Sequence, residues 1–429
     1  MNRIVLGCIA DDFTGATDLA NNLVRSGMRV VQTFGVPTAP LSSDVDAVVV
    51  ALKSRTIPAD QAIAQSLDAL TWLKAQGAAQ IYFKYCSTFD STPEGNIGPV
   101  TEALMDALNC KFTIATPAFP DNGRTVFKGY LFAGAVLLNE SGMQNHPLTP
   151  MTDANLVRVM QAQTKRKVGL IDHTVMAKGT AAIAEKIKQL ESEGVSVAIV
   201  DATSNDDLKK LGPALMGMSL VTAGSGVAIG LPGNWGLQAS PQAAALPKAQ
   251  GYQAIVSGSC SLATQGQVAH YKNSGLPSWQ FEPLNWTSAN VAQQIKADVQ
   301  KALAWAQALL AKGPVLIYAT TDADTLQKVQ AKFGREQASE WMESALAQVS
   351  VGLQALGVKQ WVIAGGETSG ACVQALNISQ MQIGPQIDPG VPWCFAPLHG
   401  AGHLTLKSGN FGTPDFFTKA FHVLSGASA

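Results

Sequence analysis

The sequence of 429 residues is poor in charged side chains and has almost no net charge. Aspartate, glutamate, lysine and arginine make up 14% of the chain, and the formal net charge is −1. Without an excess of positive charge, the chain has no overall field that would attract a nucleic acid or an anionic membrane surface. We therefore expect no nucleic acid and no membrane among its partners.

Cysteine pairs and long apolar runs are also missing. The six cysteines are scattered and none forms a C-x-x-C pair, so the sequence predicts neither a disulfide framework nor a zinc site. The first apolar run stops at Asp11, after too few residues for the core of a signal peptide. No run approaches the roughly 20 apolar residues that span a bilayer. These absences favour a cytoplasmic location.

Two common nucleotide-binding fingerprints do not occur. The segment "GCIADDFTGATD" lacks G-x-G-x-x-G and carries acidic residues where a pyrophosphate would need bare backbone amides. The P-loop pattern G-x-x-x-x-G-K-[ST] is found nowhere in the chain. Other modes of nucleotide binding stay open.

What the chain does contain is a repeated alternation of short apolar runs and helical patterns. Hydrophobic residues make up 47% of the sequence, and runs with little alternation between helices are typical of parallel sheets covered on both faces. The expected strands of the first half lie at 4–10, 30–34, 47–52, 81–85, 112–115, 168–171 and 197–201. We predict an α/β protein with two α/β domains, mainly parallel sheets and an active site in the cleft between the domains.

A change of composition marks the predicted domain boundary. The segment 236–250, "GLQASPQAAALPKAQ", has two prolines and no convincing apolar period, which indicates a linker. The α/β pattern begins again after it. We expect one domain over 1–240 and a second over 250–429.

In the first half, polar side chains gather where the predicted strands end. Asp11 and Asp12 follow the first strand, Arg55 follows the strand at 47–52, and Lys84 is followed by Asp90, Ser91 and Thr92. The carboxyl ends of parallel strands meet at one edge, where α/β proteins bind ligands. Carboxylates and hydroxyls suit sugar hydroxyls, while Arg and Lys suit a carboxylate or phosphate. Each residue alone could be a helix N-cap, but their convergence favours a site for an acidic polyol.

In the second half, glycine-rich turns follow the predicted strands. Three turns carry the pattern, and their candidate residues are Ser257, Gly258 and Ser259, then Gly365, Gly366, Glu367 and Thr368, and finally Gly402. Glycine allows close approach of the backbone, and helix N-termini favour phosphate oxygens. Any one turn alone is explained as a tight connection, whereas three in one domain favour a nucleotide cradle. Glu367 is the expected Mg²⁺ carboxylate.

With these segments in place, the chain resembles the four-carbon acid sugar kinase family. The resemblance rests on "IADDFTGATDLANNLVRSG", "STFDSTPEGNIGPV", "SGSCS", "GGETSG" and "LKSGNFG", which span both halves. It implies an N-terminal acid-sugar domain, a C-terminal nucleotide domain, and transfer of phosphate from ATP, with Mg²⁺, to an acid sugar.

The resemblance also implies roles for individual residues. The family's nucleotide positions fall on Ser257, on 365–368 and on Gly402, and its sugar motif falls on Asp11, Asp12, Arg55, Lys84 and 90–92. Much of the family reads D-S-T-L-R-G where this chain has Glu94 in place of the arginine. This departure favours the branch that phosphorylates the 4-hydroxyl of a 3-oxo-tetronate over kinases of threonate or erythronate.

Phosphoryl transfer asks for a carboxylate near the attacking hydroxyl. We expect Asp12 in this role, with Asp90 as the next candidate, while Arg55 and Lys84 hold the carboxylate of the substrate. Two other functions were weighed: a non-catalytic sugar-acid binding module, and a metal-dependent aldolase or hydrolase using Asp11 and Asp12. A homodimer is expected on base rates alone.

Overall fold

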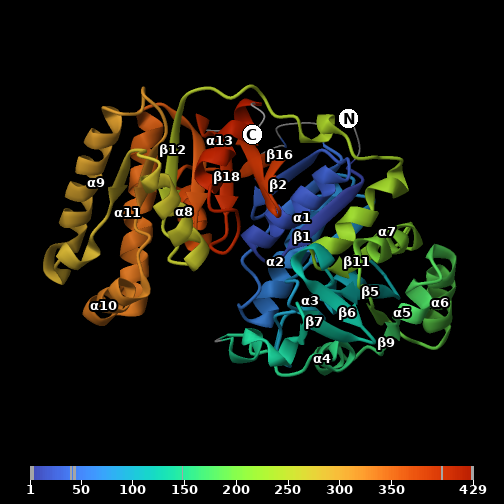
Figure 1. Ribbon diagram of the computed structural model, residues 1–429. Coiled ribbons are helices and arrows are strands. Elements are labelled where there is room, and N and C mark those ends of the chain that lie inside the picture. The colour runs from blue at the N-terminus through green and yellow to red at the C-terminus, as the bar shows by residue number, and fades with distance from the viewer. Residues whose placement is uncertain (1–3, 39–40, 42–44, 147, 398–399, 427–429) are drawn as a thin grey trace. The chain divides into compact units, whose positions relative to one another are not determined.

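The computed structural model describes residues 4–38, 41, 45–146, 148–397 and 400–426. The chain divides into two compact units, Met1–Ala244 and Ala245–Ala429. Each unit contains a sheet of mainly parallel strands with helices packed on it (Figure 1). The predicted fold class, two α/β domains with mainly parallel sheets, is confirmed. The placement of an active site between them stays a prediction.

The N-terminal unit is built on a parallel sheet in the order β2-β3-β1-β4-β11-β5-β10-β9. Strands β1 and β3, with the sequences LGCIA and AVVVA, are fully buried, because a parallel sheet is covered on both faces. The strands are β1 (Leu6–Ala10), β2 (Val30–Phe34), β3 (Ala47–Ala51), β4 (Gln80–Lys84), β5 (Thr113–Thr116), β9 (Val168–Ile171), β10 (Val197–Val200) and β11 (Leu220–Ala223).

The helices of this unit form the crossovers between parallel strands. Helix α1 connects β1 to β2 and α2 connects β3 to β4 in the opposite direction along the sheet, so right-handed crossovers put them on opposite faces. The helices are α1 (Phe13–Arg25), α2 (Ala59–Ala75), α3 (Ile97–Ala107), α4 (Leu156–Gln163), α5 (His173–Met176), α6 (Thr180–Ser192) and α7 (Asn205–Ala214).

A small antiparallel sheet in this unit was not predicted from the sequence. It consists of β6 (Arg124–Phe127), β7 (Tyr130–Ala133) and β8 (Val136–Leu137). The turn between β6 and β7 has only two residues, Lys128 and Gly129, both with positive φ, as in type I′ hairpins. Asp201, fully buried after β10, accepts hydrogen bonds from the backbone N–H groups of Lys128 (2.6 Å) and Gly129 (2.8 Å).

The sheet of the C-terminal unit has the order β13-β14-β12-β15-β18-β17-β16. The first five strands in this order, β13, β14, β12, β15 and β18, pair in parallel. Strand β17 pairs antiparallel with β18, and β16 pairs antiparallel with β17. The strands are β12 (Tyr252–Ser257), β13 (Ser278–Gln280), β14 (Val315–Tyr318), β15 (Val358–Ala364), β16 (Gln380–Asp388), β17 (Val391–Ala396) and β18 (Gly402–Lys407).

Helices α8 and α13 share one apolar core of the C-terminal unit. Tyr271 of α8 packs with Phe416, Phe417 and Phe421 of α13 and with the fully buried Trp393 of β17. The indole Nε1–H of Trp393 donates to the carbonyl of Ala420 at 2.7 Å, so this large side chain is buried without an unpaired donor. The helices are α8 (Leu262–Asn273), α9 (Val291–Gln307), α10 (Ala323–Phe333), α11 (Arg335–Ala355), α12 (Gly366–Ala375) and α13 (Phe416–Ser425).

Short 3₁₀ helices complete both units. They are Pro120–Asn122, Leu138–Glu140, Gly142–Asn145, Ser225–Gly230, Pro232–Trp235, Pro241–Ala244, Pro283–Asn285 and Ser288–Asn290. Across the described residues, no helix is both long and apolar enough to cross a bilayer.

The anchoring of the β6–β7 turn can be tested by Asp201→Ala. The change leaves the buried N–H groups of Lys128 and Gly129 without their acceptor, which should destabilise the N-terminal unit by about 2–4 kcal/mol. Urea denaturation gives the loss of stability, and hydrogen exchange should show faster exchange at residues 128 and 129. The control is Asp206→Ala, whose side chain is 77% exposed. Equal effects of the two variants would contradict the anchoring role.

Candidate functional site

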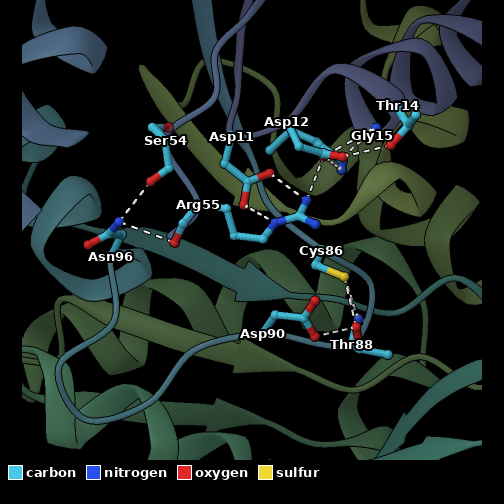
Figure 2. Close-up of polar contacts among 11 residues, drawn as sticks. Asp11, Asp12, Thr14, Gly15, Ser54, Arg55, Cys86, Thr88, Asp90 and Asn96 are labelled. Carbon is cyan, nitrogen blue, oxygen red and sulfur yellow. Dashed lines mark hydrogen bonds and ion pairs between the residues drawn. The ribbon is translucent and has the colours of Figure 1, made fainter. Parts of the chain in front are cut away.

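The polar residues predicted at the strand ends of the N-terminal unit do come together. Strand β1 pairs with both β3 and β4, and the register places Ala10 beside Ala51 and Lys84. Asp11 follows β1 directly, and its backbone N–H donates to the carbonyl of Lys84 at 3.1 Å. The carboxyl ends of three strands therefore deliver four charged residues to one edge of the sheet. Figure 2 shows Asp11, Asp12 and Arg55 together, and Lys84 joins them through Asp12.

The four charged side chains form a connected set of ion pairs. The Arg55 guanidinium contacts Asp11 through two hydrogen bonds, from Nε at 2.9 Å and from Nη2 at 2.8 Å. The same Nη2 lies 2.5 Å from Oδ1 of Asp12, and Lys84 Nζ lies 3.4 Å from that oxygen. Two carboxylates thus face two cations, and both cations predicted to hold a substrate carboxylate already have protein partners.

The two aspartates differ in their proton affinity. Burial raises the pKa of Asp11, and the neighbouring Arg55 and Lys84 only partly offset it. Burial also acts to raise the pKa of Asp12, but the charges of Lys84 and Arg55 and the hydrogen bonds from Thr14 and Gly15 outweigh it, so this pKa is lowered. Asp12 is therefore fully ionised at neutral pH, a strong hydrogen-bond acceptor and a weak base.

Gly15 makes room for Lys84 at the start of α1. Asp12 is the N-cap of this helix, and its carboxylate accepts from the Gly15 N–H at 3.2 Å and from the Thr14 hydroxyl at 2.8 Å. A Cβ on Gly15 would stand 1.8 Å from Lys84 Nζ and 2.2 Å from Asp12 Oδ1. No other residue type fits here without moving the ammonium that faces Asp12.

Asp90 belongs to a neighbouring part of the same site. Its carboxylate accepts from the Thr88 hydroxyl at 2.5 Å, and the Thr88 hydroxyl is also 2.7 Å from the thiol of Cys86. Burial raises the pKa of Cys86 to about 11, and the charges of Arg55 and Asp90 both act on that thiol. Asp90, Thr88 and Cys86 form a group of contacts that Figure 2 shows separately from the ion pairs of Arg55.

The Ser91 hydroxyl and the backbone carbonyl of Thr92 are already bound by a protein side chain. Gln163 donates through Nε2 to the Ser91 hydroxyl at 2.6 Å and to the Thr92 carbonyl at 2.7 Å. Ser91 is also 3% exposed. These contacts fix the loop that carries Asp90. The Ser91 hydroxyl therefore positions this loop, and the residue has almost no surface open to a ligand.

The sequence analysis missed Asn96, which holds the Arg55 loop in place. Its Nδ2 donates to the carbonyls of Ser54 (2.7 Å), Ile57 (2.9 Å) and Arg55 (3.2 Å). Asn96 stands directly before α3, a position where a cap is expected, yet its side chain does not cap that helix. No signal within the sequence distinguishes this asparagine from an ordinary cap.

In the C-terminal unit, the turns after β12 and β15 lie against each other. The N–H groups of Gly258 and Ser259 donate to the carbonyl of Ala364 at 3.0 and 3.3 Å. A Cβ on Gly258 would stand 2.2 Å from the Thr368 hydroxyl oxygen, and Gly365 has a φ of +124°. Both positions therefore require glycine for close backbone approach.

Other residues predicted for the nucleotide cradle lie at this same edge. The Ser257 hydroxyl is buried and lies 2.7 Å from the hydroxyl of Thr320, which follows β14. Gly366 and Glu367 form the first turn of α12, whose N-cap is Gly365. The N-termini of α8 and α12 thus both begin at the carboxyl ends of parallel strands, an arrangement suited to phosphate oxygens.

The structure does not bring Gly402 to this group. This glycine opens β18, and the register of β18 with β15 pairs His403 with Gln360 and Lys407 with Ala364. Five residues of strand, roughly 16 Å, separate Gly402 from the edge that carries Gly365. Its φ of +79° and the Lys359 carbonyl, 2.5 Å from a hypothetical Cβ, explain the glycine structurally.

The glycine that does join the cradle is Gly409, just beyond the other end of β18. A Cβ on Gly409 would stand 2.6 Å from the Ser259 hydroxyl oxygen, and its carbonyl accepts from the hydroxyls of Ser261 (2.5 Å) and Thr264 (2.9 Å). The segment "LKSGNFG" carried this glycine in the sequence. If the strand is taken to end at Lys407, Gly409 is the glycine that follows the strand end, and Gly402 is not.

The carboxylates do not form a metal cage by themselves. Within the part of the chain that the structure describes, no three His, Cys, Asp or Glu side chains gather as a metal site. Glu367 is an exposed carboxylate in the first turn of α12. One such carboxylate fits an ion that is bound mainly by nucleotide phosphates, as Mg²⁺ often is.

The fit between Gly15 and Lys84 predicts strong coupling between these positions. Gly15→Ala should destabilise the N-terminal unit by about 1–3 kcal/mol because its methyl group displaces the ammonium. In a Lys84→Ala background the clash with the ammonium is absent and only the close contact with Asp12 Oδ1 remains. The same change should then cost less, giving a coupling energy of about 1 kcal/mol or more. Urea denaturation of the single and double variants measures it.

The matched control is Gly142→Ala, where a Cβ meets nothing within 4 Å. Its effect should be small and additive with Lys84→Ala. Additive effects for Gly15→Ala and Lys84→Ala would show that the ammonium does not depend on the glycine.

Comparison with known proteins matches both units over nearly their whole length. Residues 6–231 match the family model "Sugar-binding N-terminal domain" and residues 254–417 match "Nucleotide-binding C-terminal domain". Proteins named 3-oxo-tetronate kinase from Burkholderia multivorans and Cupriavidus necator are 56% and 54% identical. The alignments cover 100% and 99% of this chain and 99% and 98% of those proteins.

Two solved structures share the fold of the whole chain. A Salmonella typhimurium LT2 protein, provisionally named as a tRNA synthase, has a TM-score of 0.91 at 44% identity, covering 97% of this chain and 98% of its own. A Haemophilus influenzae protein has a TM-score of 0.85 at 45% identity, covering 97% and 100%. On this full-length similarity, the chain belongs to the family of two-domain proteins that includes the 3-oxo-tetronate kinases, with a sugar-binding N-terminal and a nucleotide-binding C-terminal domain.

Proposed function

We propose that this protein is an ATP-dependent kinase that phosphorylates the 4-hydroxyl of a 3-oxo-tetronate. The observation that carries the proposal is the identity of 52–56% over essentially the full chain to relatives named 3-oxo-tetronate kinase. The charges at the two strand-end edges agree with it. One edge offers carboxylates and cations for an acidic polyol, and the other offers glycine turns and helix N-termini for a polyphosphate.

Asp12 is the residue that we propose beside the attacking hydroxyl. Its lowered pKa keeps it ionised at neutral pH, so it can accept a hydrogen bond from the hydroxyl, but the same lowered pKa makes it a poor acceptor of a full proton. This property suits phosphoryl transfer, because the loose transition state asks for positioning more than for early removal of the proton. Asp90, held by Thr88, is the alternative carboxylate.

Arg55 and Lys84 are proposed to bind the substrate carboxylate while they remain paired with Asp11 and Asp12. Arg55 keeps 23% of its side chain exposed, whereas Lys84 keeps only 3%. Arg55 is therefore the more accessible cation, and Lys84 acts mainly through Asp12. The carboxylates of Asp11 and Asp12 prevent an excess of positive charge, so hydroxyl groups of the acid can also be bound.

The nucleotide is proposed to bind at the carboxyl edge of the C-terminal sheet. The residues assigned to it are Ser257, Gly258, Ser259, Gly365, Gly366, Glu367 and Thr368, with Gly409 in place of Gly402. Mg²⁺ would be held by the phosphates and Glu367, and when bound it neutralises charge on the transferred group. Backbone amides of the two glycine turns orient the phosphates for transfer.

We also propose a cytoplasmic location for the enzyme. Six free cysteines and the use of ATP suit the cytoplasm. A homodimer stays a prediction from base rates.

Substrate specificity can be tested with a panel of four-carbon acids. With Mg-ATP, we expect 3-oxo-tetronates to stimulate ADP release much more strongly than threonate or erythronate, because Glu94 replaces the family's arginine in an exposed part of the Asp90 loop. Phosphorus NMR of the product should show a phosphate monoester on carbon 4. Stronger stimulation by threonate or erythronate would contradict the substrate assignment, and no stimulation by any acid would contradict the kinase.

A further inference from the structure

Lys407 is a lysine buried completely inside the C-terminal unit. It is the last residue of β18 and has no exposed surface. Its ammonium donates to three neutral oxygens: the Thr264 hydroxyl at 2.9 Å, the Gly409 carbonyl at 3.0 Å and the Ser408 carbonyl at 3.1 Å. The ammonium is thus fully hydrogen-bonded by groups that carry no charge.

No carboxylate balances this cation in the described part of the chain. Lys419 of the same unit, by contrast, forms an ion pair with Asp388 at 2.5 Å, whereas no Asp or Glu oxygen of the described residues lies within 4.0 Å of Lys407 Nζ. Burial lowers the pKa of Lys407 to about 8, so the group is still mostly protonated at neutral pH. Burying a charge without an oppositely charged partner costs free energy of folding, so a functional benefit of this lysine is expected.

The position of Lys407 supplies one. Its own carbonyl accepts from the N–H of Gly365 at 2.8 Å, and the Gly409 carbonyl that it holds also accepts from Ser261, the N-cap of α8. The backbone of Lys407 is thus linked to the turn at 365–368, and its ammonium is linked to the Gly409 turn and to the start of α8. The N-termini of α8 and α12 add positive partial charge at the same place.

We propose that Lys407 is a positioning residue for the nucleotide phosphates. It acts in two ways. Its hydrogen bonds fix the Gly409 turn against α8, and its positive charge stabilises the negative charge of a bound polyphosphate. The inference rests on the proposed function, since it concerns the same nucleotide site. It adds an electrostatic contribution from a residue that does not touch the ligand.

A purely structural role is the rival explanation, and the charge distinguishes the two. Lys407→Gln keeps two N–H donors for the carbonyls of Ser408 and Gly409 but removes the charge. Lys407→Met removes both the donors and the charge, and it serves as the second variant if the glutamine side chain is too short to reach. Melting temperature without ligand reports whether each variant is folded.

The experiment is calorimetric titration of adenosine, AMP and ADP, without added metal, into wild type and both variants. We expect ADP affinity of Lys407→Gln to fall by about tenfold or more, AMP affinity to fall less, and adenosine affinity to change by less than about twofold. The control is Lys312→Met, which removes an exposed lysine just before β14, at the other edge of the sheet.

Each outcome decides the question. Losses that grow with the number of phosphates support the proposal. Equal losses for adenosine and ADP in both folded variants, or an ADP affinity within twofold of wild type, overturn it. A wild-type protein that binds adenosine and ADP with the same affinity contradicts the proposed nucleotide site itself, and thus the proposed function.

Discussion

The ion pair between Arg55 and Asp11 is the interaction on which the N-terminal site depends. It joins the segment after β3 to the end of β1 through two hydrogen bonds, and the same guanidinium neutralises Asp12. With Lys84 on its other side, Asp12 stays ionised despite its partial burial. Without Arg55, the buried carboxylate of Asp11 and the partly buried carboxylate of Asp12 would repel each other, and at least one would take up a proton.

The C-terminal unit meets the opposite electrostatic requirement. Its strand-end edge carries glycine turns, two helix N-termini and the buried Lys407, with Glu367 as an exposed carboxylate. Such an edge has a surplus of positive potential, which suits a polyphosphate. Both units thus have a polar edge where parallel strands end, and under the proposed function the two edges bind ligands of different chemistry.

Much of this organisation could be predicted from the sequence because it follows from strand ends. Buried apolar runs locate the parallel strands, and the residues just after them must meet at one edge. Asp11, Asp12, Arg55 and Lys84 were found in this way. The antiparallel β6–β8 sheet was not predicted. Its first two strands are joined by only two residues, Lys128 and Gly129, so the sequence has no long polar segment that would mark a turn between them.

The contacts and positions that the sequence did not show have a common physical cause. Gly402 was preferred over Gly409 because the sequence does not show where β18 begins and ends. The pairing of Arg55 with Asp11 was not predicted, because it depends on a contact between residues 44 positions apart in the chain. Asn96 and Lys407 act through partners on other elements, and such partners become visible only once the chain is folded.

The central claim is that the two units divide the work, with the acid bound by the N-terminal unit and the nucleotide by the C-terminal unit. It is tested most directly by titrating ADP into Asp12→Asn and measuring acid-dependent ADP release from Mg-ATP by the same variant. The account predicts ADP affinity within about twofold of wild type, with turnover reduced by about a hundredfold or more. An Asp12→Asn protein that loses ADP binding, or one that turns over like wild type, would contradict it.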